Sequence, residues 1–124
     1  MNIIFFARKT HANMERRENV SLFFLKKEDF MLERTFQHKL IREIERRFPG
    51  SVVIKQDARQ GLPDLVIYYG KYWAMLECKE SATAPHQPNQ DYYVRLFDSF
   101  SFCRFIFPEN AEEVLHDLER AFES

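Results

Sequence analysis

Apolar and polar positions alternate with different periods along the chain, and each period predicts a different element. From residue 31 to residue 48, apolar side chains recur three or four positions apart, which is the spacing of one buried helix face. They are Leu32, Phe36, Leu40, Ile41, Ile44 and Phe48. Pro49 and Gly50 then stop the predicted helix. The segment SVVIK, residues 51–55, predicts a short strand.

The next segment, GLPDLVIYYGKYWAMLECKES at residues 61–81, has the pattern of a two-stranded hairpin. Its two-residue turn begins at Gly70, because a type II′ turn requires glycine in the first central position. In that register Asp64 on the first strand lies directly opposite Glu77 on the second. The hairpin therefore predicts two facing carboxylates among apolar neighbours.

The rest of the chain predicts a loop, two helices and a strand. Residues 81–89, SATAPHQPN, have loop composition, and Asn89 is a candidate cap for a helix through Phe100. A strand follows at residues 102–107, and a last helix begins with the capping-box pair Asn110 and Glu113. The residues expected to face inward are Tyr93, Leu96, Phe97 and Phe100 in the first helix and Val114, Leu115, Leu118 and Phe122 in the second. This order predicts an α/β fold whose mixed sheet is covered on both faces.

The length and composition indicate one globular domain. The chain has 124 residues, of which 45% are hydrophobic and 30% charged. Residues 1–30 show no sustained period and form an N-terminal extension, for which a strand with a short helix, an arm on a second subunit, and a segment upstream of a start at Met31 all stay open. Residues 31–124 form the domain. Apolar runs are too short to span a membrane, so we expect a cytoplasmic protein.

The net charge of −1 conceals an uneven distribution. Residues 1–62 carry 13 Lys and Arg against 8 Asp and Glu, whereas residues 63–124 carry 5 against 11. Such asymmetry can mark a nucleic-acid partner, and an ordinary solvated surface explains it equally well. Cys78 and Cys103 lack the spacing of a metal site and are expected to be small buried side chains.

The facing carboxylates of the hairpin need a partner. Like charges directly opposite each other in a sheet are destabilising, so Asp64 and Glu77 must share a proton or bind a cation. Lys79 returns to the same face about 6.5 Å further along the strand, and one lysine neutralises one carboxylate only. A hard cation such as Mg²⁺, which prefers carboxylate, water and phosphate oxygens, would use both.

These residues resemble the signature of a known superfamily. Pro63-Asp64 followed by Glu77-Cys78-Lys79 is similar to the motif of PD-(D/E)XK nucleases, and GLPDLVIYYGKYWAMLECKE resembles the VRR-NUC and Holliday junction resolvase branches, which viruses also encode. The resemblance covers about residues 31–107. It implies a restriction-endonuclease-like mixed sheet with helices on both faces. It also implies that Asp64 and Glu77 bind Mg²⁺ or Mn²⁺ and that Lys79 assists the attacking water.

Further site residues follow from the same resemblance. Glu33 matches a glutamate on the first helix of these families, where it would act in catalysis and support a second ion or a bound water; its alternative is a solvated helix charge. Gln90 matches a glutamine at the start of the helix after the motif, and its alternative is an ordinary polar residue of a first helical turn. Independently of the resemblance, Arg59 and Gln60, immediately before Gly61, and Lys55 are candidate phosphate contacts.

The expected function is a Mg²⁺- or Mn²⁺-dependent DNA endonuclease for branched DNA such as a four-way junction. Members of these branches act as homodimers, because two strands are cut by two active sites. If the protein is virus-encoded, it would work in the host cytoplasm. Two alternatives stay open: a nuclease for flaps, ends or specific duplex sites, and a non-catalytic member of the fold that binds DNA or a partner protein.

Overall fold

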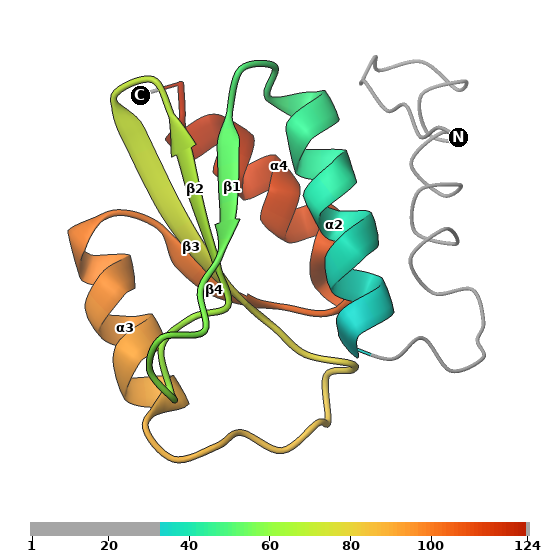
Figure 1. Cartoon of the computed structure of the whole chain (residues 1–124), viewed down its shortest axis with the longest axis vertical. Coiled ribbons are helices and arrows are strands. Elements are labelled where there is room, and N and C mark those ends of the chain that lie inside the picture. The colour runs from blue at the N-terminus through green and yellow to red at the C-terminus, as the bar shows by residue number, and fades with distance from the viewer. Residues whose placement is uncertain (1–32, 124) are drawn as a thin grey trace.

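The computed structural model describes residues 33–123 (Figure 1). The predicted extension at residues 1–30 and the first two residues of the predicted helix lie outside this part. The elements are α2 (Glu33–Arg47), β1 (Val52–Lys55), β2 (Leu65–Tyr69), β3 (Tyr72–Cys78), α3 (Gln90–Phe100), β4 (Cys103–Ile106), the 3₁₀ helix η1 (Pro108–Asn110) and α4 (Ala111–Ala121). Within residues 33–123, no helix is both long and apolar enough to cross a bilayer.

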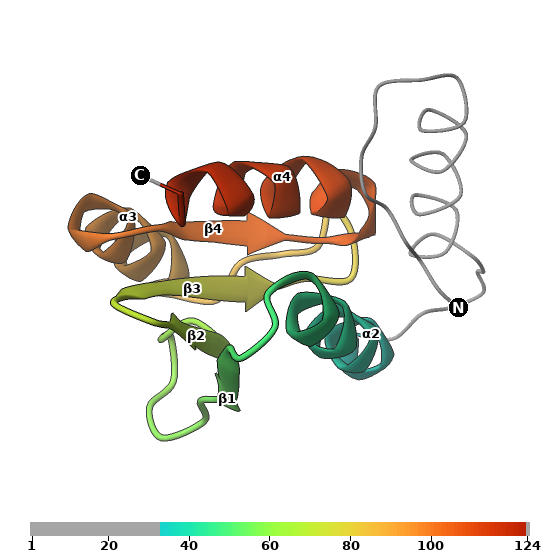
Figure 2. The ribbon, with the colours of Figure 1, turned by 90° about the horizontal axis from the view of Figure 1, so that it is seen from above.

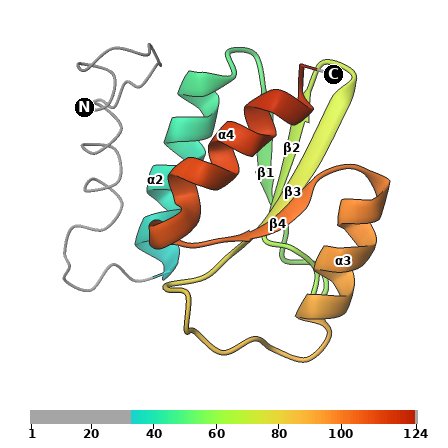
Figure 3. The same ribbon diagram turned by 180° about the vertical axis from the view of Figure 1, so that it is seen from behind.

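The four strands form one mixed sheet in the order β1-β2-β3-β4. The two neighbouring pairs β1–β2 and β2–β3 are antiparallel, and β3–β4 is parallel. Helices α2 and α4 cover one face, and α3 lies on the other (Figures 2 and 3). The predicted α/β class, with a mixed sheet flanked by helices on both faces, is confirmed.

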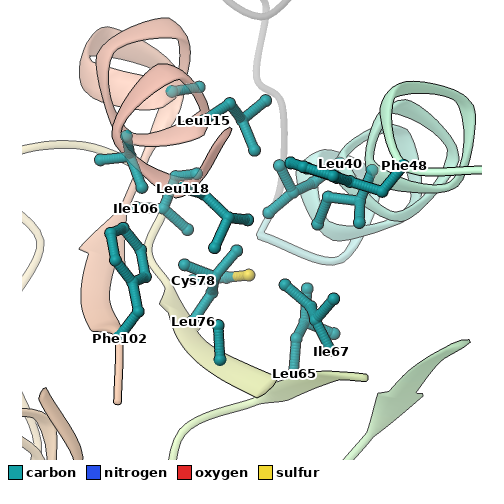
Figure 4. Packing of buried hydrophobic residues seen from close by; sticks show 14 of the residues in the cluster. Leu40, Phe48, Leu65, Ile67, Leu76, Cys78, Phe102, Ile106, Leu115 and Leu118 are labelled. Atoms are coloured by element: carbon teal, nitrogen blue, oxygen red, sulfur yellow. The ribbon is translucent and has the colours of Figure 1, made fainter. Parts of the chain in front are cut away.

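The pleat of the hairpin divides the core in two. One face of β2 and β3 packs against α2 and α4, where Leu65, Leu76 and Cys78 are completely buried (Figure 4). The other face carries a smaller cluster around Val66 and Met75 under α3. Most inward positions predicted for the first and last helices are confirmed as buried: Phe36, Leu40, Ile44, Phe48, Val114, Leu115, Leu118 and Phe122. Ile41 is only half-buried at the edge of the core. Each of the buried side chains contributes about 1.5–3 kcal/mol to folding.

The turn of the hairpin has the predicted conformation. Gly70 has a φ of 61°, in the left-handed region, while Lys71 does not adopt a positive φ, which agrees with a type II′ turn. The predicted register is also confirmed, because Tyr69 pairs with Tyr72 and Leu65 with Leu76. A single glycine therefore sets the alignment of the two strands that carry the candidate site.

The predicted inward face of α3 is partly wrong. Phe100 is 62% exposed, although the periodicity places it in the core. The sheet-facing side of the helix is set instead by Gln90 and Val94, which are one helical turn apart and both buried. The aromatic stripe lies on one flank of the helix, where Tyr93, Leu96 and Phe97 are only half-buried.

Both predicted side-chain caps are also wrong. Asn89 precedes α3 with a φ of 76° and makes no capping hydrogen bond through its side chain. The Asn110 side chain accepts a hydrogen bond from Phe107 N at 2.9 Å and donates one to Phe105 O at 3.2 Å. It closes the turn after β4 in this way and does not form a capping box with Glu113. Local turn closure competes with capping for the same short polar side chain.

A buried ion-pair network joins α2 to α4. Glu43 accepts hydrogen bonds from Arg46 at 2.9 Å and Arg47 at 3.3 Å, and Arg47 also bonds Glu112 at 3.3 Å. Burial raises the pKa of Glu43 to about 7, although both arginines act to lower it. The sequence places Glu43 off the buried stripe, yet it is 3% exposed because the two arginines satisfy its charge. We interpret this network as structural.

Replacing Arg47 with methionine is expected to destabilise the fold by about 3 kcal/mol at pH 8, because it leaves Glu43 buried with less compensating charge. The loss should shrink at pH 5, where Glu43, whose pKa is raised, takes up a proton. Urea unfolding at both pH values measures the difference. Arg42→Met on an exposed position of the same helix is the control and should change stability by less than about 0.5 kcal/mol. An equal loss at both pH values would contradict the assignment.

Candidate active site

The motif residues meet at one end of the hairpin. Asp64 immediately precedes β2, Glu77 is the penultimate residue of β3, and Lys79 directly follows β3. Because β2 and β3 are antiparallel, the start of one lies beside the end of the other. Extending the register by one residue puts Asp64 opposite Glu77, on the face of the sheet that carries α3. The predicted juxtaposition is therefore present in the structure.

Asp64 is held in place from both neighbouring strands. Its Oδ2 accepts a hydrogen bond from Cys78 N at 2.9 Å, and its backbone oxygen accepts one from Gln56 N at 2.7 Å. The Gln56 side chain in turn donates to Pro63 O at 3.2 Å. The backbone bond between Gln56 and Asp64 continues the β1–β2 ladder past the formal start of β2, and the other two bonds use side chains. The half-buried carboxylate thus has a defined direction before any ligand is present.

A glutamine bridges the other two motif residues. Gln90 Nε2 donates to Glu77 Oε2 at 2.6 Å, and Gln90 Oε1 accepts a hydrogen bond from Lys79 Nζ, also at 2.6 Å. The same Oε1 accepts from Gln87 N at 2.8 Å. All three bridged side chains are buried: Glu77 is 2% exposed, Lys79 6% and Gln90 8%. The sequence predicts a substrate contact for Gln90, whereas its observed contacts are those of a residue that positions the site.

The two carboxylates stand in an unfavourable electrostatic environment. Burial, and after it the neighbouring charge of Asp64, raise the pKa of Glu77 to about 8 against the opposing charge of Lys79. Burial also raises the pKa of Asp64, against its hydrogen bond from Cys78 and the charge of Lys79. Glu77 Oε1 is buried without a hydrogen-bond partner in the described part of the chain. An orphaned, buried carboxylate oxygen is costly unless a proton or a cation occupies it.

Lys79 is oriented by two carbonyl oxygens. Besides Gln90 Oε1, its Nζ donates to Pro85 O at 3.1 Å, in the loop that connects β3 to α3. An ammonium group has three donors, so one remains for a group that enters the site. Its direction is restricted by the other two bonds. The lysine therefore combines a positive charge with one aimed donor next to the carboxylates.

Glu33 lies near these residues without joining them. Burial at the start of α2 raises the pKa of Glu33, and the charge of Asp64 raises it further while Lys79 lowers it. Across residues 33–123, however, no three histidine, cysteine, aspartate or glutamate side chains gather closely enough to hold a metal ion. Asp64 and Glu77 are thus the carboxylates that the hairpin brings together, and Glu33 belongs to their electrostatic surroundings.

The predicted phosphate contacts are exposed residues of β1 and of the loop that follows it. Lys55 ends β1 opposite Leu65, and its charge lowers the pKa of Asp64. Arg59 and Gln60 are exposed in the loop between β1 and β2. That loop lies against the start of α3, because a Cβ added at Gly61 would come within 3.3 Å of Asn89. Lys55 shares the face of its partner Leu65, which is opposite to the face that carries Asp64, so it is linked to that carboxylate by its charge and not by the direction of its side chain.

The loop between β3 and α3 contains a contact that the sequence does not predict. The His86 ring stacks on Phe105 with 4.2 Å between ring centroids, and its Nδ1 lies 2.7 Å from Asp91 Oδ1. Phe105 pairs with Glu77 in the parallel ladder. His86 thus fastens the loop that supplies the carbonyl partner of Lys79. The only indication of this contact in the sequence is Asp91, which follows His86 by five residues.

Comparison with family models, with curated proteins and with solved structures found no match to this chain. The strongest element of the geometry of the site is the contact set of Glu77, Lys79 and Gln90.

Proposed function

We propose that this protein is a metal-dependent DNA endonuclease that hydrolyses phosphodiester bonds in branched DNA, with a restriction-endonuclease-like fold. The observation that carries the proposal is the buried Glu77, whose Oε1 lacks a partner within the described residues while Asp64 lies across the hairpin. A pair of carboxylates with raised pKa values beside an aimed lysine is a costly arrangement for a purely structural site. The same arrangement is favourable in a site where a bound cation neutralises the charge of the two carboxylates.

The donor set fits Mg²⁺ or Mn²⁺. Asp64 and Glu77 would hold the ion through carboxylate oxygens, which these hard cations prefer, and the remaining positions would belong to water and substrate phosphate. When bound, the ion would neutralise the carboxylates and polarise the scissile phosphate. Glu33 would support a second ion or a bound water from the start of α2.

Lys79 and Gln90 would have different roles in the reaction. The third donor of Lys79 Nζ would orient the attacking water and stabilise the negative charge that develops on the phosphate. Gln90 would keep that ammonium and Glu77 Oε2 at a fixed separation, because one amide group binds both. In this proposal Gln90 positions the reacting groups and does not itself contact DNA.

The charge distribution supports one orientation of DNA on the protein. Lys55, Arg59 and Gln60 would contact phosphates, which fixes the register of a strand across the site. Helix α4, in contrast, has more acidic than basic residues on its surface, although three of the acids pair with Arg47 or Arg120, and it would be a less favourable side for a polyanion. Its exposed or half-exposed acidic residues are Glu112, Glu113, Asp117 and Glu119. The choice of branched DNA and of a homodimer derives from the resemblance of GLPDLVIYYGKYWAMLECKE to the resolvase branches.

The direct test is incubation of the full chain with an end-labelled four-way junction, with Mg²⁺ or with EDTA. We expect paired symmetric nicks with Mg²⁺ and at least a 100-fold lower rate in EDTA. Flap, blunt-end and duplex substrates in parallel decide the substrate: faster cutting of any of these would replace the junction. Intact substrates throughout, together with tight junction binding, would favour the non-catalytic alternative and overturn the proposal.

A further inference from the structure

The loop between β3 and α3, residues 81–89, begins shortly after Lys79 and ends just before Gln90 (Figure 1). All of its residues are exposed or half-buried, and none belongs to either core cluster. Segments without buried apolar contacts are the parts of a protein that open most easily. The position of this loop must therefore depend on a small number of specific contacts.

Three consecutive residues of the loop make contacts with the site. Pro85 O accepts a hydrogen bond from Lys79 Nζ at 3.1 Å, and Gln87 N donates one to Gln90 Oε1 at 2.8 Å. Gln90 Oε1 is also the second acceptor of the Lys79 ammonium group. Both acceptors of that group thus depend on the loop, the first directly and the second through Gln87. His86 lies between the two backbone contacts and binds through its side chain.

The side chain of His86 is held from two sides. Its ring stacks on Phe105 of β4, with 4.2 Å between ring centroids and 20° between ring planes, and its Nδ1 lies 2.7 Å from Asp91 Oδ1. Phe105 pairs with Glu77 in the parallel ladder of β3 and β4. Asp91 directly follows Gln90 in the first turn of α3. The ring is therefore fixed to the strand beside Glu77 and to the helical turn that carries Gln90.

The exposure of these contacts makes their effect local. The His86 side chain is 35% exposed and that of Asp91 61%. Exposed polar pairs contribute little to the stability of a whole domain. Loss of the imidazole should thus free the loop without unfolding the protein. The Pro85 carbonyl is one peptide unit away, so the Lys79 ammonium group would lose an acceptor that restricts the direction of its third donor.

We propose that His86 is a positioning residue, which aims the Lys79 ammonium group through the Pro85 carbonyl and itself contacts neither substrate nor ion. Its effect on cleavage rests on the proposed function, in which Lys79 orients the attacking water. Such an effect is large, because a misplacement of about 1 Å lowers a rate by about 100-fold. The orientation of Lys79 by the loop is independent of that function, since it follows from the contacts of residues 85–87.

Single-turnover cleavage of the labelled four-way junction in Mg²⁺ tests the effect on the reaction. His86→Ala should lower the rate constant at saturating protein by about 10- to 100-fold. The protein concentration that gives half of this rate should change less than three-fold. In a Lys79→Met background the same replacement should lower the rate less than two-fold, because a residue that acts through Lys79 has no further effect once the lysine is absent.

His116→Ala is the matched control for removal of a histidine that faces an acid. The Nδ1 of His116 lies 3.5 Å from Glu119 Oε1 on α4, which covers the other face of the sheet. This variant should cleave the junction as fast as the parent. The melting temperatures of both alanine variants should stay near that of the parent.

Acylation of the lysine side chains, followed by mass spectrometry, tests the orientation without any cleavage. Lys79 is 6% exposed and should react with a small acylating reagent at least 10-fold more slowly than Lys71, which is exposed in the turn. In His86→Ala the acylation rate of Lys79 should rise at least five-fold, while that of Lys71 stays the same. The His116→Ala control should leave both rates unchanged.

Three results would overturn the positioning role: an unchanged cleavage rate in His86→Ala, an equal loss of rate with and without the Lys79 side chain, or an unchanged acylation rate of Lys79. The two proposals fail separately. A parent that leaves the junction intact, but whose Lys79 reacts faster after His86→Ala, refutes the nuclease and keeps the positioning role. A cleaving parent whose Lys79 reacts at the same rate with and without His86 does the reverse.

Discussion

Replacing Glu77 with glutamine is expected to abolish junction cleavage and, at the same time, to stabilise the metal-free protein at alkaline pH. In the parent, the pKa of Glu77 is raised to about 8 in the folded state from an ordinary value of 4.5. A raised folded-state pKa contributes stability that is fully present below pH 4.5 and is lost as the pH rises through 8. Glutamine is neutral throughout, so the gain should grow from pH 5 to pH 9 and reach about 5 kcal/mol.

Urea unfolding in EDTA at pH 5, 7 and 9 measures this difference. Cleavage of the labelled junction in Mg²⁺ should fall at least 1,000-fold in the same variant. Mg²⁺ should also raise the melting temperature of the parent but not that of Glu77→Gln, since ligands stabilise the state that binds them. Glu113→Gln, on an exposed position of α4, is the control for removal of one carboxylate. Retained cleavage, or a stability gain that does not depend on pH, would refute the role of Glu77.

Replacing Lys79 with methionine is expected to lower the cleavage rate by about 100- to 10,000-fold while Mg²⁺ binding persists. Methionine keeps much of the buried volume but removes the charge and the donor that we assign to the attacking water, and such groups contribute about this much to catalysis. The carboxylates of Asp64 and Glu77 remain in place. The variant thus separates the proton and charge chemistry of the site from metal binding.

Single-turnover cleavage rates measure the effect of Lys79→Met, and the thermal shift with Mg²⁺ measures ion binding. Lys71→Met at the far end of the same hairpin is the matched control, because that lysine is exposed in the turn. Equal losses of cleavage rate in Lys79→Met and Lys71→Met would indicate a general effect of lysine removal. Loss of the Mg²⁺ shift in Lys79→Met would show that the lysine acts on the ion-binding site and not on the chemical step.

The hairpin was predictable because its determinants are local. One glycine in the turn fixes the register, and the period-two pattern fixes which side chains share a face. The helix faces of α2 and α4 were predictable for the same reason, since a 3.6-residue period is a property of consecutive residues. From these rules alone, Asp64, Glu77 and Lys79 could be assigned to one site.

The errors concern features that depend on distant partners. Phe100 has helical periodicity with Tyr93, Leu96 and Phe97, but α3 packs on the sheet through Gln90 and Val94 and leaves the aromatic flank partly open. Glu43 is buried because Arg47 pairs with it and also reaches Glu112 on the distant helix α4, which the spacing of charges within α2 does not reveal. Gln90 has four hydrogen-bonding positions, and only tertiary structure decides that two of them bind Glu77 and Lys79.

The turn at Gly70 has a consequence for how such a site tolerates changes in length. The two carboxylates face each other because Asp64 is as far before the turn as Glu77 is after it. Residues added to both arms in equal number would lengthen the hairpin and keep the pair opposed. One residue added to a single arm would turn its carboxylate to the other side of the sheet, into the core beneath α2 and α4. A protein that keeps the two carboxylates opposed can therefore vary in total hairpin length, but the two arms of its hairpin must stay equal in length.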